Sequence, residues 1–192
     1  MKKLAVFASG SGTNFQAILD AVREGTLDAE ITLLVCDKPG AKVIERAESA
    51  GVDTFVFSAK EFASKVEFET LIVERLTKLE IDLVVLAGYM RLIDQTLLAA
   101  YPNQIVNIHP SFLPDFPGKD AIGQAYRAGV KTTGVTIHFV DEGMDTGPII
   151  AQRTIEIEQD DTLERLEQKV HEVEHIFYPE TLQSLLKEIA VG

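Results

Sequence analysis

The stretch 82–87 limits the possible folds more than any other part of this sequence. Its core, Leu-Val-Val-Leu, has no polar interruption and predicts a strand that is buried on both faces. Largely apolar runs at 4–8 and 31–36 predict two further buried strands, 54–57 predicts a brief one, and 104–108 is predicted to be a fifth strand. Because segments with helical spacing separate these runs, the pattern is typical of parallel βαβ units. We therefore expect an α/β fold: an open, mostly parallel, Rossmann-like sheet with helices on both faces.

The segments between the predicted strands carry apolar residues at helical spacing. They predict helices over 15–22, 41–50 and 62–79, and a short one over 97–101. The run 110–118 contains three prolines and is predicted to be a loop, because proline disrupts both helices and sheet ladders.

The pattern changes in the last third of the chain. Apolar and polar residues alternate over 135–139, a second strand-like run covers 149–157, and a glycine-containing turn lies between them at 142–148. These features predict a long antiparallel hairpin appended to the parallel sheet. Asp161, with Glu164 three residues later, resembles a capping box and predicts the start of a final helix.

Length and charge narrow the class of protein. A chain of 192 residues without repeats or linkers suits one domain. Its net charge of −12 and pI near 4.7 argue against a nucleic-acid or anionic-membrane partner, but leave a small anionic ligand possible. The lone cysteine, Cys36, excludes an internal disulfide and a thiolate zinc cluster. The sequence shows neither a secretory signal nor a membrane span, so we expect a soluble, cytoplasmic protein.

The loop 9–14, Ser-Gly-Ser-Gly-Thr-Asn, joins the first predicted strand to the first helix. Its glycines allow a sharp turn, and the helix start presents free N–H groups and a positive dipole end. The loop is therefore a predicted phosphate-binding site. A dinucleotide fingerprint would need a third glycine where Phe15 stands, although Asp37 could act as its ribose-binding acid. An NAD-binding oxidoreductase or sensor domain thus stays an alternative.

A polar pair, Asn107 and His109, lies at the end of the fifth predicted strand. The two residues are two positions apart, so their side chains project to the same face. An amide and an imidazole at the carboxyl end of a parallel strand could polarise a carbonyl oxygen and move a proton. Asp145 and His138 are weak candidates when taken singly. The spacing of His, Asp and Glu matches no metal site.

Several segments together resemble the folate-dependent formyltransferase family. They are Ser-Gly-Ser-Gly-Thr-Asn-Phe-Gln-Ala-Ile at 9–18, Leu-Ala-Gly-Tyr-Met-Arg at 86–91, Asn-Ile-His-Pro-Ser-Phe-Leu-Pro at 107–114 and Met-Asp-Thr-Gly-Pro at 144–148. The third segment resembles the whole family, and the first narrows the resemblance to members that formylate glycinamide ribonucleotide. The resemblance covers essentially the whole chain. It implies a single formyltransferase domain over 1–192, with a phosphate-binding half at about 1–100 and a folate-binding, catalytic half at about 101–192.

This resemblance implies a reaction in purine biosynthesis. The co-substrate 10-formyltetrahydrofolate would donate its formyl group to the amine of 5-phosphoribosylglycinamide, without a metal. Asn107, His109 and Asp145 would form the catalytic set. Asn107 and protonated His109 would stabilise the developing oxyanion, and a nearby Asp145 would favour the imidazolium.

The resemblance also assigns binding roles by position. The substrate would contact Gly12, Thr13, Asn14, Ile108, His171 and Glu174, the loop residues holding its phosphate and Glu174 its ribose hydroxyls. Folate would contact Met90, Arg91, Leu92, Ile93, Asn107, Val140, Asp141, Glu142, Gly143, Met144 and Asp145. Lys65 would meet an anionic end of a ligand, for which we favour the glutamate tail of folate.

Related enzymes with the same catalytic motif are the nearest alternatives. Formyltetrahydrofolate hydrolase would use water as the acceptor, but normally carries an N-terminal regulatory domain. Methionyl-tRNA formyltransferase carries a C-terminal barrel, and this acidic chain is a poor partner for tRNA. The sequence also departs from some family members, which carry a histidine just after Pro117-Gly118, so Asp120 is left out of the catalytic set. Small molecules are the expected partners, and a homo-oligomer is possible.

Overall fold

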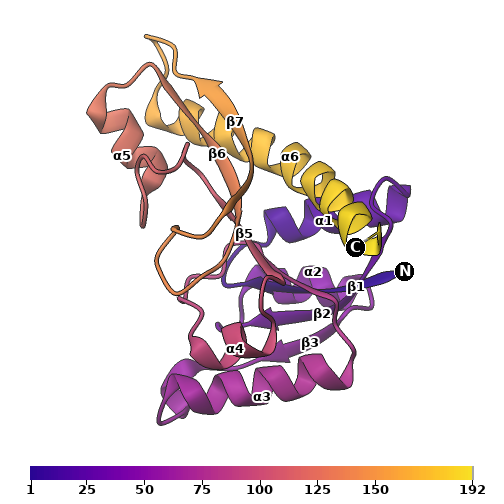
Figure 1. Cartoon of the computed structure of the whole chain (residues 1–192). Coiled ribbons are helices and arrows are strands. Elements are labelled where there is room, and N and C mark those ends of the chain that lie inside the picture. Colours follow the sequence, from indigo (N-terminus) through magenta and orange to yellow (C-terminus); the bar gives the residue numbers. More distant parts are fainter. Residues whose placement is uncertain (192) are drawn as a thin grey trace.

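One seven-stranded sheet runs through the computed structural model, which describes the backbone of residues 1–191 and the side chains of residues 1–189 (Figure 1). The strand order is β3-β2-β1-β4-β5-β6-β7. The strands are β1 (Lys2–Ala8), β2 (Ala29–Cys36), β3 (Asp53–Val56), β4 (Leu83–Leu86), β5 (Ile105–His109), β6 (Thr132–Phe139) and β7 (Ile149–Glu156). Strands β1 to β5 are parallel, whereas β6 and β7 are antiparallel to their neighbours. The predicted fold class is confirmed.

Helices cover both faces of the sheet, as expected for parallel strands that are apolar throughout. They are α1 (Thr13–Glu24), α2 (Lys42–Ser49), the short 3-10 helix η1 (Ala59–Glu61), α3 (Lys65–Lys78), α4 (Gln95–Ala100), α5 (Ala121–Ala128) and α6 (Leu163–Val191). One face packs against α1, α2 and α6, and the opposite face packs against α3 and α4 (Figure 1).

Tyr178 of α6 anchors that helix to the middle of the sheet. Its side chain is fully buried, and its hydroxyl donates to the carbonyl of Leu86 at 2.8 Å, with the carbonyl of Val106 at 3.4 Å. Burial raises the pKa of this phenol, so the hydroxyl stays a donor. The bond to Leu86 ties α6 to the carboxyl end of β4, where a functional site is expected.

Two local predictions were wrong in detail, and one helix was missed. The third helix does not begin at 62; α3 begins at Lys65, and the hydroxyl of Ser64 accepts the Glu67 N–H as its cap at 3.4 Å. The capping box was wrong as well, because Thr162 caps α6 by accepting the N–H of Arg165 at 3.1 Å. The helix α5 had not been predicted.

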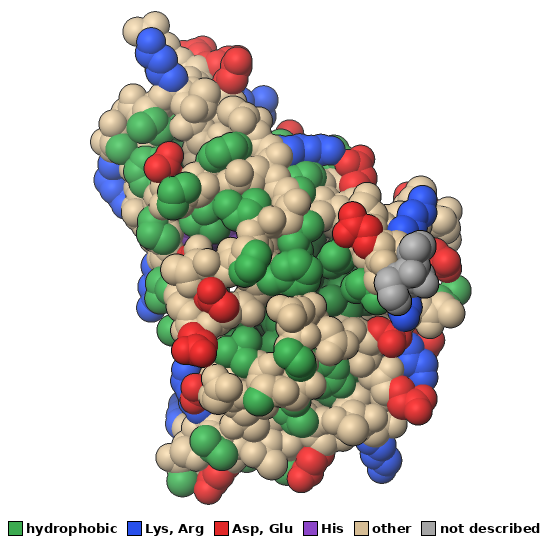
Figure 2. All heavy atoms as spheres, viewed as in Figure 1, with side chains coloured by type: hydrophobic (Ala, Val, Ile, Leu, Met, Phe, Trp, Pro, Cys, Tyr) green, Lys and Arg blue, Asp and Glu red, His purple; other side chains and the backbone are tan. Residues whose placement is uncertain are grey.

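The topology creates a crevice between β1 and β4. The chain leaves β1 toward β2 and β3 on one side, then returns to β4 and β5 on the other, so the loops after β1 and β4 separate. The two loops still contact each other, and the Ser9 N–H donates to the Gly88 carbonyl at 3.1 Å. Figure 2 shows apolar side chains (green) gathered over the middle of one face, with charged side chains distributed around them. No helix within residues 1–191 is both long enough and apolar enough to cross a membrane.

Candidate active site

A cavity of about 570 Å³ opens at the carboxyl ends of β1, β4 and β5. Pockets for small molecules and cofactors typically have volumes of about 300–1,000 Å³. Its walls come from the 10–14 loop, the 86–93 segment, the end of β5 with its loop, the 140–145 turn and the first half of α6. The cavity therefore lies at the point where an open α/β sheet places its ligands.

Gly12 turns the chain from β1 into α1. Its φ is 75°, in the left-handed region, and a Cβ at this position would lie 2.5 Å from Cγ2 of Val43. Within residues 1–191, no side chain caps α1 and no acidic residue lies in its first turn. The backbone N–H groups of Thr13 and Asn14 consequently face outward at the positive end of the helix dipole. This end of the cavity suits a phosphate.

A second polar group lies beside this loop. The Glu174 carboxylate accepts a hydrogen bond from Asn14 Nδ2 at 3.4 Å and lies 2.8 Å from Nδ1 of His171. The hydrogen bond to Glu174 raises the pKa of His171, although partial burial opposes the shift. The Oδ1 atom of Asn14 is buried and has no partner among the described residues.

Asn107 and His138 face each other across β5 and β6. The strand register pairs them directly, and Nδ2 of Asn107 lies 3.4 Å from Nε2 of His138. The other ring nitrogen of His138, Nδ1, lies 2.8 Å from the Phe139 carbonyl oxygen, which can only accept. In the matching tautomer Nδ1 carries the proton and Nε2 accepts from Asn107. His138 thus orients the Asn107 amide, a role that the sequence analysis missed.

Asp145 projects from the turn between β6 and β7 toward both histidines. Its Oδ2 lies 3.5 Å from His109 Nδ1, and its Oδ1 lies 3.8 Å from His138 Nε2. Oδ2 also accepts the Gly118 N–H at 2.8 Å, which joins this turn to the proline-rich loop after β5. The carboxylate is only 11% exposed, so its charge acts at short range with little screening by water.

His109 is held between two acceptors. Its Nε2 lies 2.9 Å from the Phe116 carbonyl oxygen, while Nδ1 faces the Asp145 carboxylate. Each ring nitrogen therefore faces an oxygen that can accept a hydrogen bond, and the two contacts hold the ring in one orientation.

Another part of the cavity wall is more apolar. Met90 and Leu92 follow β4, and Met144 lies in the 140–145 turn; all three are exposed apolar residues that line the cavity. The turn is braced by Asp141, whose Oδ1 accepts from the Thr146 hydroxyl at 2.7 Å and from the Gly143 N–H at 2.9 Å. These hydrogen bonds lower the pKa of Asp141, and the bond from Thr146 has the larger effect. This part of the wall suits a flat, largely apolar ligand.

The structure brings most of the predicted site residues to this one cavity. Those that line it are Gly12, Thr13, Asn14, Met90, Arg91, Leu92, Ile93, Asn107, Ile108, His109, Val140, Gly143, Met144, Asp145, His171 and Glu174. Lys65, Asp141 and Glu142 are not among the lining residues. Lys65 instead donates from Nζ to the Leu92 carbonyl at 3.3 Å. Glu167 of α6 and Lys119 also line the cavity and were not predicted.

Asp37 does not act as a free ribose-binding acid. Its carboxylate accepts from the Ser9 hydroxyl at 2.5 Å and from Arg91 Nε at 2.8 Å, and the residue is buried. The alternative of an NAD-binding domain required an acid able to receive two ribose hydroxyls. Because the Asp37 carboxylate is already bonded to Ser9 and Arg91, it does not support the NAD-binding alternative.

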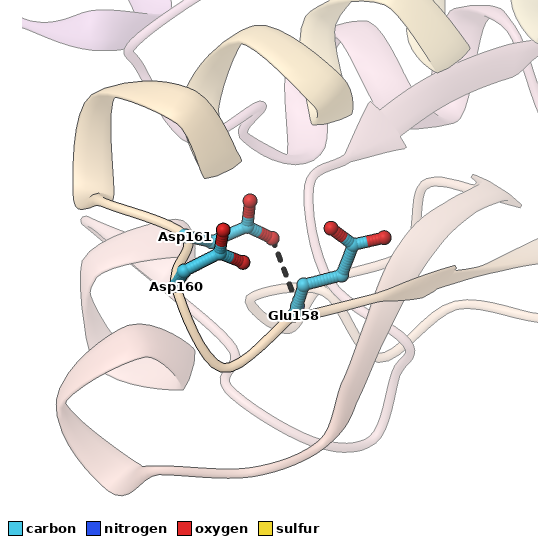
Figure 3. A group of neighbouring side chains, drawn as sticks. All are labelled: Glu158, Asp160 and Asp161. Carbon is cyan, nitrogen blue, oxygen red and sulfur yellow. Dashed lines mark hydrogen bonds between the residues drawn. The ribbon is translucent and has the colours of Figure 1, made fainter.

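Figure 3 shows the group of carboxylates in the described residues that is close enough to share a cation: Glu158, Asp160 and Asp161. They lie in the turn before α6, and none of them lines the cavity. The Asp161 carboxylate already accepts from the Glu158 N–H at 2.8 Å and from Lys169 Nζ. These two donors satisfy the charge of Asp161 without a metal.

Comparison with known proteins identifies the family. Residues 2–182 match the formyl transferase family. The chain belongs to this family. It is 59% identical over 186 residues to the phosphoribosylglycinamide formyltransferase of Bacillus subtilis, an alignment that covers 97% of this chain and 95% of that protein. It is also 38% identical to the human trifunctional purine biosynthetic protein adenosine-3, over 94% of this chain but only 18% of that protein.

Solved structures of formyl transferases have the same fold. Glycinamide ribonucleotide transformylase 1 from Geobacillus kaustophilus has a TM-score of 0.95 and 63% identity, covering 97% of this chain and 99% of that one. Phosphoribosylglycinamide formyltransferase from Bacillus halodurans has a TM-score of 0.94 and 56% identity, covering 96% of this chain and 95% of that one. The seven-stranded sheet with its antiparallel edge is thus the fold of this family.

Proposed function

We propose that this enzyme transfers the formyl group of 10-formyltetrahydrofolate to the amine of 5-phosphoribosylglycinamide, a step in purine biosynthesis. One observation carries the proposal: Asn107, His109 and Asp145 lie in the same cavity as an uncapped helix N-terminus. A phosphate cradle and an oxyanion-stabilising group within one cavity fit a phosphorylated amine acceptor.

The acceptor occupies the polar end of the cavity. The N–H groups of Thr13 and Asn14 hold its phosphate, and Gly12 provides the turn that exposes them. Glu174 accepts from the ribose hydroxyls, and Asn14 Nδ2 orients its carboxylate by donating to it at 3.4 Å. His171 balances the charge of Glu174 at 2.8 Å, so that the carboxylate can lie near a phosphorylated ligand.

The folate occupies the more apolar part of the cavity. The segment 90–93 and the 140–145 turn contact its ring system, which supplies the formyl group to the reacting centre. Lys65 is attached to this segment through the Leu92 carbonyl at 3.3 Å, and its exposed ammonium meets the glutamate tail. Asp141 shapes the turn through its bonds to Gly143 and Thr146.

Asn107 and His109 stabilise the negative charge that develops on the formyl oxygen as the amine attacks. His138 holds the Asn107 amide in place, and the Asp145 carboxylate lies 3.5 Å from Nδ1 of His109. Because all four side chains are buried or half-buried, their dipoles and charges act in a poorly screened environment. The attacking amine must lose a proton and the departing folate nitrogen must gain one. Asp145 is the carboxylate close enough to His109 to take part in this transfer.

The remaining expectations accompany this function. We infer one domain that acts on small molecules in the cytoplasm, and that does not act on a nucleic acid or at a membrane. The net charge of −12 supports the first of these exclusions, since polyanions repel such a chain. A homo-oligomer stays a prediction.

Steady-state kinetics with three proteins tests the proposal: the wild-type chain, Asn107→Ala and Asp145→Asn. The wild type is expected to convert the ribonucleotide to its N-formyl product. Each variant is expected to lose about 10²–10³ in kcat, with a much smaller change in either KM, because these groups act mainly in the transition state. Arg153→Ala, which breaks an exposed ion pair with Glu180 at 2.6 Å and lies outside the cavity lining, is the control and should leave kcat unchanged. Near-normal kcat in both site variants would refute the assigned roles.

A further inference from the structure

Asp37 is a buried carboxylate that the proposed mechanism does not use. It directly follows β2, and its side chain is 1% exposed. Burying a carboxylate is costly unless hydrogen bonds and an opposite charge compensate for the lost water. The residues that compensate Asp37 come from two loops on either side of the crevice.

The contacts of Asp37 join these two loops. Oδ1 accepts from the hydroxyl of Ser9, the residue immediately before the 10–14 loop, at 2.5 Å. Oδ2 accepts from Nε of Arg91, in the segment proposed to bind folate, at 2.8 Å. Ser9 completes the connection, since its Oγ accepts the Met90 N–H at 2.9 Å. One carboxylate therefore contacts the loop of each proposed substrate.

The burial of the carboxylate fixes the relative position of the loops. Shifting either loop would withdraw a hydrogen bond from a charge that has almost no access to water, and such a loss is costly. Arg91 is the charged partner, at 34% side-chain exposure, and its guanidinium also lies 5.9 Å from the Phe68 ring. The low-energy arrangement is thus the one in which Ser9 and Arg91 both contact Asp37.

We propose that Asp37 is a positioning residue that holds the phosphate loop and the folate-binding segment in register with each other. Asp37 contacts neither ligand; it acts through Ser9 and Arg91. This inference rests on the proposed function, because that function assigns a different substrate to each loop. Its consequence is that losing the carboxylate weakens the binding of both substrates together.

The test compares Asp37→Ala and Asp37→Asn with a matched control, Asp82→Ala. The Asp82 carboxylate also bridges β1 and β4, accepting the Lys3 N–H at 2.8 Å, but it lies at the opposite end of these strands. For Asp37→Ala we expect KM to rise about tenfold for each substrate, the equivalent of one charge-assisted hydrogen bond. Asp37→Asn should show a smaller rise, since its amide can still bond to both Ser9 and Arg91. Asp82→Ala should lose stability with both KM values unchanged.

Hydrogen–deuterium exchange supplies a readout that does not depend on catalysis. In Asp37→Ala, the amides of both the 9–12 and the 88–93 segments should exchange faster than in the wild type. In Asp82→Ala, the exchange rates of both segments should equal those of the wild type. The inference is overturned if amide exchange becomes faster in only one of the two segments, or if only one of the two KM values rises. It is also overturned if the exchange rates and the KM values all stay at their wild-type levels. If Asp37→Ala does not fold, the same comparison is made with Asp37→Asn. A wild-type chain that transfers no formyl group would refute the proposed function, while the exchange result would still decide whether Asp37 joins the loops.

Discussion

Replacing Gly12 by alanine should damage both stability and phosphate binding. The Gly12 backbone has a φ of 75°, which an L-residue adopts at a cost of about 1–2 kcal/mol. The new methyl group would also lie 2.5 Å from Cγ2 and 2.6 Å from Cβ of Val43, in the first turn of α2. Relieving such a clash in a packed region costs about 1–3 kcal/mol.

Together these costs predict that Gly12→Ala loses about 2–5 kcal/mol of unfolding free energy. For a chain of this size the melting temperature should fall by roughly 4–20 °C. Because relief of the clash moves the loop that carries the Thr13 and Asn14 N–H groups, KM for the ribonucleotide should rise more than KM for the folate.

Thermal unfolding followed by circular dichroism measures the first effect, and steady-state kinetics the second. Gly10→Ala is the control for stability, since Gly10 lies in the same loop and a methyl group added there would meet no atom within 4 Å. Its melting temperature should stay near that of the wild type. If Gly12→Ala has the melting temperature of the wild type and binds the ribonucleotide equally well, Gly12 is not needed for the turn that exposes the Thr13 and Asn14 N–H groups.

Further variants test other parts of the structure. Tyr178→Phe should cost about 1–3 kcal/mol, because the Leu86 carbonyl loses a buried partner at 2.8 Å, and urea unfolding measures this loss. The hydrogen bond to Glu174 raises the pKa of His171 in the folded state above its unfolded value of about 6.5. The pairing therefore contributes its full stabilisation at pH values below the unfolded pKa. This contribution is lost as the pH rises through the folded-state pKa. The stability difference between wild type and His171→Asn should therefore be larger near about pH 6 than near about pH 8.5, and a difference independent of pH would contradict the pairing. Asn14→Ala should raise KM for the ribonucleotide and leave KM for the folate unchanged.

The sheet was predictable because its strands are encoded locally. Runs such as 83–87 are apolar without interruption, and only a strand covered on both faces accommodates them well. Helix starts were less predictable, since Thr162 and Asp161 are both good N-caps in sequence; in the fold Thr162 caps α6, while the Asp161 carboxylate accepts from Lys169. The short helix α5 contains Gly123 and follows a proline-rich loop, so its local signal is weak.

The site was predictable only where a motif carries the chemistry. Asn107 and His109 lie two apart on one strand, and this spacing is visible in the sequence. The partnership of Asn107 with His138 depends on the register of β5 and β6, which no local pattern reveals. The same holds for Asp37, whose two partners come from segments that are distant in sequence and meet only in the folded sheet.

Consumption of 10-formyltetrahydrofolate by the purified chain, measured with and without 5-phosphoribosylglycinamide, tests the central claim most directly. We predict that the folate loses its formyl group only when the ribonucleotide is present, and that one N-formyl product appears for each formyl group lost. Equal loss in water alone would instead indicate a hydrolase, and would leave the phosphate loop at Gly12 without its proposed substrate. No loss under either condition would contradict the assignment of Asn107, His109 and Asp145 as a formyl-transfer site.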